Sequence, residues 1–216
     1  MSSEPAALIA NNSSAFIIAL EPDGSAQVSL RLVYDLTAEA ERTGFERVKA
    51  NASTFADAYA TRLEPLAARA SNETGREMSI RSPDAEFKTI HSGTTGVVEL
   101  SATWTNIATE RDGRVVLAEP FNDGFAPERP FVVNAPDGYE LVSVAPNPNG
   151  ETRSTVAWTD GQSLDGFAVE FEATGMANEE TTPVTTSSSE MPVGAAPVLA
   201  LLAVVSVVAV LVRKPE

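Results

Sequence analysis

A stretch of 22 residues near the carboxyl end, Met191–Val212, contains no charged residue. As an α-helix it would extend about 33 Å, which is enough to cross a hydrocarbon core of about 30 Å. A helix packed in a soluble core would carry a polar stripe, whereas this stretch has a single polar side chain, Ser206. The pattern predicts a transmembrane helix over 191–212, with the lipid bilayer as its partner.

The charges beside this stretch predict its orientation. Arg213 and Lys214 follow it, while the preceding sequence NEETTPVTTSSSE, residues 178–190, carries only acidic charges. Because basic residues stay on the cytoplasmic side of a span, residues 1–190 are expected outside the cell. Residues 1–24 show neither the basic start nor the apolar run of a signal peptide, which we interpret as a missing leader. A tail-anchored protein with its domain inside the cell is the alternative.

The chain is strongly acidic, with 30 acidic against 15 basic residues and a formal net charge of −15. Before the span its only lysines are Lys49 and Lys88. Such a surface keeps a protein hydrated in molar salt, where the Debye length falls to about 3 Å, so we interpret the source as a halophile, with an acidic mesophile as the alternative. No basic patch is present to bind phosphates, which argues against nucleic acid as a partner. The chain also has no cysteine, which excludes disulfides, thiolate catalysis and sulfur-ligated metals.

Residue patterns before the span predict an α+β fold. Residues 14–20 form a short apolar strand, an EPDG turn follows, and residues 25–36 alternate apolar and polar side chains, which is typical of a hairpin with one buried face. Thr37 is the expected start of a helical stretch that pauses near Asn51, resumes after a cap at Ser53 and ends at Gly75. Further alternating strands are expected over 77–90, 96–108, 113–121, 130–136, 139–146, 154–159 and 166–173.

These elements predict a mostly antiparallel sheet with a helical hairpin or broken helix on one face. Trp104 and Trp158 are in phase with apolar neighbours on their strands, so both are expected in the core. A helical stripe is expected to cover them through Phe55, Tyr59, Leu63 and Leu66. The expected segments are a disordered N-terminus, the α+β ectodomain, an acidic Thr/Ser-rich stalk, the transmembrane helix and a cytoplasmic tail (1–13, 14–175, 176–190, 191–212 and 213–216).

Candidate catalytic residues are few. His91 is the only histidine and is followed by Ser92, but neighbouring residues of a strand point to opposite faces, which does not suit a Ser–His pair. Asp123, Asp137 and Asp160 could supply paired carboxylates, yet among 30 acidic residues such candidates carry little information. Residues 122–128 resemble a calcium-binding turn only weakly, because the spacing of carboxylates is absent. We therefore expect no enzyme activity, no cofactor and no metal site.

Four asparagines stand in N-x-S/T triplets and become candidate glycan acceptors if the domain is extracellular: Asn11, Asn12, Asn51 and Asn72.

The sequences NETGREMSI (72–80) and APDGYELVSVAPNPNGETRSTVAWTDG (135–161) resemble blocks of an uncharacterised haloarchaeal family of membrane-anchored envelope proteins. The resemblance covers about residues 15–173 and implies the fold and the compartment, but no active site. Some members of that family continue into a cytoplasmic winged-helix module, whereas here four residues follow the span. The tail is also similar to an archaeal C-terminal sorting and anchor signal, with MPVGAAP in place of the usual Pro-Gly-Phe.

The sequence thus predicts a membrane-anchored extracellular domain, serving as a non-catalytic envelope or interaction protein with an envelope protein as partner. A sensory ectodomain that acts through a separate cytoplasmic partner is the first alternative. A surface hydrolase is a less favoured one.

Overall fold

The computed structural model describes residues 13–122 and 125–175. The predicted N-terminal segment, stalk, transmembrane helix and tail lie outside these residues, apart from Ser13. Within the described ranges, no helix combines the length and the apolar character that a membrane crossing requires.

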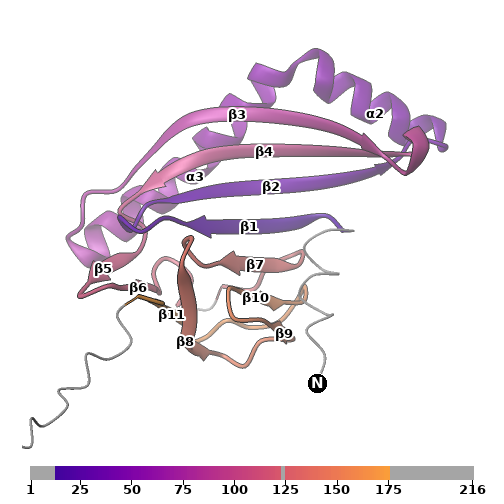
Figure 1. The fold of residues 1–216 in the computed structure, drawn as a ribbon. Coiled ribbons are helices and arrows are strands. Elements are labelled where there is room, and N and C mark those ends of the chain that lie inside the picture. The colour runs from indigo at the N-terminus through magenta and orange to yellow at the C-terminus, as the bar shows by residue number, and fades with distance from the viewer. Residues whose placement is uncertain (1–12, 123–124, 176–216) are drawn as a thin grey trace, which may run out of the picture. The chain divides into compact units, whose positions relative to one another are not determined.

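The largest element is a seven-stranded sheet that is antiparallel except where β1 runs parallel to β7 (Figure 1). Its strands, in spatial order, are β3 (Ser79–Ile90), β4 (Thr95–Thr105), β2 (Ala26–Asp35), β1 (Ala15–Leu20), β7 (Phe131–Asn134), β10 (Thr155–Trp158) and β9 (Gly150–Glu151). The EPDG turn between β1 and β2 requires its glycine, because Gly24 has φ +79° and an added Cβ would lie 2.6 Å from the carbonyl oxygen of Ala108.

A second, antiparallel sheet has four strands, in the order β5 (Thr109–Arg111), β6 (Arg114–Leu117), β11 (Ala168–Ala173) and β8 (Tyr139–Ala145). The strands β5 and β9 were not expected from the sequence, because two or three residues are too few to show alternation. The α+β class and the mostly antiparallel pairing are confirmed, whereas the sequence predicted one sheet and the chain forms two.

Among the described residues there are two α-helices, α2 (Glu39–Ala50) and α3 (Ala52–Thr74), and a short 3-10 turn, η1 (His91–Gly93). Both helices lie on one side of the long strands in Figure 1, and α3 contacts β3 and β4. The predicted break occurs at Asn51, whose side-chain amide donates to the carbonyl of Arg47 at 2.9 Å. Gly75 ends α3 in the left-handed conformation, as predicted.

The predicted caps were wrong at both helix starts. Ala38, not Thr37, is the N-cap of α2, because the Thr37 hydroxyl donates to Asp35 at 2.6 Å instead. Asn51, not Ser53, is the N-cap of α3, and its side chain makes no capping bond. The α3 helix also runs through Pro65 without ending there.

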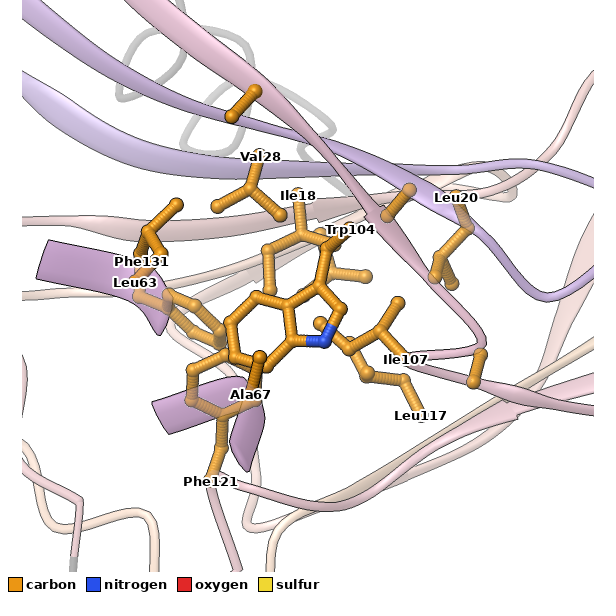
Figure 2. Close-up of a cluster of buried hydrophobic side chains, with 14 of the residues drawn as sticks. Ile18, Leu20, Val28, Leu63, Ala67, Trp104, Ile107, Leu117, Phe121 and Phe131 are labelled. Carbon is orange, nitrogen blue, oxygen red and sulfur yellow. The ribbon is translucent and has the colours of Figure 1, made fainter. Parts of the chain in front are cut away.

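One hydrophobic core lies between the seven-stranded sheet, the helices and the four-stranded sheet. Trp104 and Trp158 are fully buried in it, which confirms their predicted place. Figure 2 shows the Trp104 indole among Ile18 and Val28 of the large sheet, Leu63 and Ala67 of α3, and Leu117 of the small sheet. The core thus joins all three layers.

Candidate functional site

A groove of about 410 Å³ opens between α3 and the segment Phe125–Arg129, beside strands β1 and β2. We call it the α3 groove. Most of its lining residues are apolar, and the charged ones are Arg62, Glu128 and Arg129. The full lining is Phe16, Leu30, Tyr59, Arg62, Leu63, Leu66, Phe121, Phe125, Ala126, Pro127, Glu128 and Arg129. Its volume falls in the range of small-molecule pockets, about 300–1,000 Å³.

The helical spacing of α3 builds one wall. Tyr59, Leu63 and Leu66 follow each other at intervals of four and three residues, which places them on one helix face. Tyr59 and Leu63 are buried, whereas Leu66 is 40% exposed at the groove. The sequence predicted Leu66 as part of the buried stripe; this was wrong because no described layer packs closely over the groove at that turn of α3.

Backbone hydrogen bonds hold the opposite wall. The amide of Leu164 donates to the carbonyl of Phe125 at 2.9 Å, and the amide of Gly161 donates to the carbonyl of Pro127 at 2.8 Å. The amide of Phe16 donates to the carbonyl of Pro130 at 2.8 Å, which ties the end of this segment to β1. Phe125 and its neighbours are therefore held in place by the chain on both sides.

An aromatic cluster forms the inner side of the groove. The Phe121 ring lies 5.2 Å from Phe125 and 5.1 Å from Phe131, measured between centroids. Phe131 in turn stacks on Phe16 at 5.7 Å and contacts Trp158 at 5.7 Å. The groove is thus continuous with the core, and its inner side has the rigidity of packed rings.

The Tyr59 hydroxyl is an unusual polar group in this setting. Tyr59 is 7% exposed, and its Oη is buried without a hydrogen-bond partner among the described residues. A buried, unpaired hydroxyl costs about 1–3 kcal/mol. Burial, and to a smaller degree the charge of Glu99, raises the pKa of the Tyr59 hydroxyl well above its usual value. The group therefore stays protonated and keeps a hydrogen to donate.

Charged residues stand at the rim. Arg62 and Glu128 are exposed and Arg129 is half-buried. Within the described ranges neither Arg62 nor Arg129 has an ion-pair partner, which is also true of Arg42, Arg47 and Arg81, whereas Arg31, Arg76 and Arg114 are paired with glutamates. Glu128 reduces the positive charge of this rim but does not cancel it.

No hydrogen bond or ion pair joins the side chains of the described residues that were considered for catalysis. His91 and Ser92 are exposed in η1, where the His91 Nδ1 lies 3.3 Å from the Thr95 hydroxyl. Asp137 and Asp160 are exposed in separate turns, and Asp123 lies outside the described residues. No cluster of three or more potential metal ligands occurs in the described part of the chain.

The aspartates with shifted pKa values lie at chain reversals, Asp23 in the turn before β2 and Asp35 at the end of β2. Hydrogen bonds from Ser25 lower the pKa of Asp23, and hydrogen bonds from Thr37 lower that of Asp35. Asp23 borders a polar hollow of about 520 Å³, which also contains Glu77, Arg81 and several hydroxyl side chains. A lowered pKa keeps these carboxylates ionised and suits a turn better than proton transfer.

Two of the candidate glycan acceptors are described. Asn51 is exposed at the break between the helices, and Asn72 is exposed in the last turn of α3. Asn11 and Asn12 lie outside the described residues. Neither Asn51 nor Asn72 lines the α3 groove.

Sequence reasoning missed the α3 groove. Its residues come from four parts of the chain that alternation does not bring together. One signal was present: the loop sequence PFNDGFAPERPF, residues 120–131, holds three phenylalanines where a solvent-exposed loop would be polar.

Comparison with known families places the chain. It belongs to the family of the domain of unknown function DUF7345, whose model matches residues 17–139. The match includes α3 and the Phe125–Arg129 segment, so that it covers the lining of the α3 groove except Phe16. A comparison with curated proteins gives no match.

Proposed function

We propose that this DUF7345 protein is a non-catalytic binding module of a halophilic archaeal envelope, held outside the cell by a membrane anchor at 191–212. The α3 groove is the surface with which it takes a ligand or partner. The observation that carries this proposal is the groove itself: an apolar hollow with aromatic walls, continuous with the core. Such hollows are the usual form of small-ligand sites.

The kind of side chains at the groove supports binding rather than reaction. Among the described residues, its titratable lining consists of Tyr59, Arg62, Glu128 and Arg129. This set includes neither a nucleophile paired with a base nor two carboxylates in a polar setting, which are the arrangements that hydrolysis uses. The strongly acidic composition and the uncharged stretch before Arg213 and Lys214 support the membrane and salt-adapted parts of the proposal.

The location is tested by protease treatment of intact cells that produce the chain. We expect residues 14–175 to be cleaved or released along with a known surface protein, while a cytoplasmic marker survives. If the domain survives until the cells are lysed, the outward orientation is wrong. The same fragments after lysis serve as the control that the protease can cut this chain.

A further inference from the structure

We propose that the ligand of the α3 groove is a single-chain anionic amphiphile: an alkyl chain with a carboxylate or phosphate head, bound as a monomer. The inference rests on the proposed binding function of this groove and names the chemistry of its ligand. The alkyl chain lies between α3 and the aromatic wall, and the head lies at the rim with Arg62 and Arg129.

The shape and lining of the groove fit an alkyl chain. Leu30, Leu63 and Leu66 line, together with Phe121 and Phe125, a hollow of about 410 Å³, which is too small for a protein domain and suits a small molecule. Leu66 is one of two large apolar side chains that remain exposed in the described surface, the other being Val142 on β8. A chain in the groove would remove Leu66 from water, and each added methylene would raise affinity about fourfold.

The rim charges select the head group. The chain has twice as many acidic as basic residues, and yet two arginines without ion-pair partners in the described ranges line one apolar groove. A guanidinium matches the two oxygens of a carboxylate or phosphate, and contact pairs of this kind persist better in salt than distant charges. A cationic head would meet two like charges against the single opposite charge of Glu128.

A cysteine-protection experiment on the full chain in opened membranes tests the proposal. The chain has no cysteine, so L66C places one thiol in the groove and V142C places one at the matched exposed position outside it. The rate of maleimide labelling is measured with decanoate, decanol and decyltrimethylammonium, each below its micelle concentration. Because the readout is local, partition of the probes into lipid affects both thiols alike.

Decanoate is expected to slow labelling of L66C but not of V142C, decanol less so and decyltrimethylammonium least. Adding R62Q and R129Q to L66C should raise the decanoate concentration that gives half-maximal protection of the thiol about tenfold, as expected for two charge-assisted contacts. R42Q combined with R47Q, at two exposed arginines of α2 outside the groove, makes the matched change of two charges and should have no effect.

Two other outcomes overturn separate parts of the account. Equal protection by all three probes, unaffected by R62Q and R129Q, would refute the anionic head and leave the groove as a binding site. No protection of L66C, or equal protection of both thiols, would refute the groove as a binding site and with it the proposed function. Neither result depends on which side of the membrane the domain occupies.

Discussion

The two faces of the seven-stranded sheet are built from different side chains. On one face, Trp104, Phe131 and Trp158 are fully buried against the helices and the four-stranded sheet. On the other, Arg31 pairs with Glu99 at 3.5 Å and the Gln27 amide donates to Ser101 at 3.3 Å. A small apolar cluster extends this second face across β1, β7 and β10, made of Ala15, Ile17, Val132 and Ala157.

The comparison shows where binding can occur. Large rings gather on the face that two further layers cover, whereas the other face combines paired polar side chains on β2 and β4 with a small ring-free apolar cluster on β1, β7 and β10. The α3 groove lies at a gap in the cover of the first face, because Phe16 and Leu30, which pair in register there, are only partly buried. Affinity for apolar ligands is therefore expected at the first face and not at the second.

The largest effect is expected from removing a ring of the covered face. Trp158→Ala should reduce the free energy of unfolding by about 3–5 kcal/mol, because it leaves a cavity among Phe131 and Phe167. It also removes the hydrogen bond that the Trp158 Nε1–H donates to the carbonyl oxygen of Pro146 at 3.1 Å. Gln27→Ala on the other face should cost at most about 1 kcal/mol. Urea unfolding of both variants measures the difference, and equal losses would break the comparison.

A substitution that adds one methyl group tests how tightly the covered face is packed. An added Cβ at Gly96 of β4 would lie 2.8 Å and 2.9 Å from ring atoms of Phe45 and 3.0 Å from Leu36. Gly96→Ala should therefore destabilise the fold by about 1–3 kcal/mol, because a packed core has little room to move.

Gly44→Ala is the matched control for this substitution. An added Cβ at Gly44 would meet only Tyr34, at 3.5 Å, and Gly44 lies inside α2. Alanine should stabilise the helix there by up to about 1 kcal/mol. Thermal unfolding should therefore show shifts of opposite sign, and shifts of the same sign would contradict the packing described.

The smallest effect is expected from the polar face. Glu99→Gln removes the ion pair with Arg31, whose side chains are 28% and 19% exposed respectively. Because such pairs are partly screened, the loss should be about 0.2–1 kcal/mol and should shrink in molar KCl. A loss of unfolding free energy as large as that of Trp158→Ala would show that the polar face stabilises the fold as strongly as the covered face, which would contradict the comparison.

The sequence predicted which side chains lie on the covered face, but it did not predict which strands pair with each other. Alternation placed Trp104 and Trp158 correctly, because a period of two identifies which side chains share a face. It does not identify which strand lies beside which, so the parallel pairing of β1 with β7 and the separation of a second sheet were not foreseen.

Local sequence patterns also do not predict the environment of every single residue. Thr37 has a side chain suited to an N-cap, but its hydroxyl donates a hydrogen bond to Asp35, and α2 begins after Ala38. Leu66 has the spacing of a buried residue, but its exposure depends on how closely the distant Phe125–Arg129 segment packs. The groove therefore emerges only when segments from β1, β2, α3 and the loop before β7 are brought together.

The most direct test of the two-face account is the fluorescence of the chain's two tryptophans, Trp104 and Trp158. Both are fully buried on the covered face. We predict blue-shifted emission that resists quenching by acrylamide and iodide, and that shifts to the red only on unfolding. Red-shifted emission with easy quenching of the folded chain would place the rings on an exposed surface. That result would contradict the buried core on which both the comparison and the α3 groove depend.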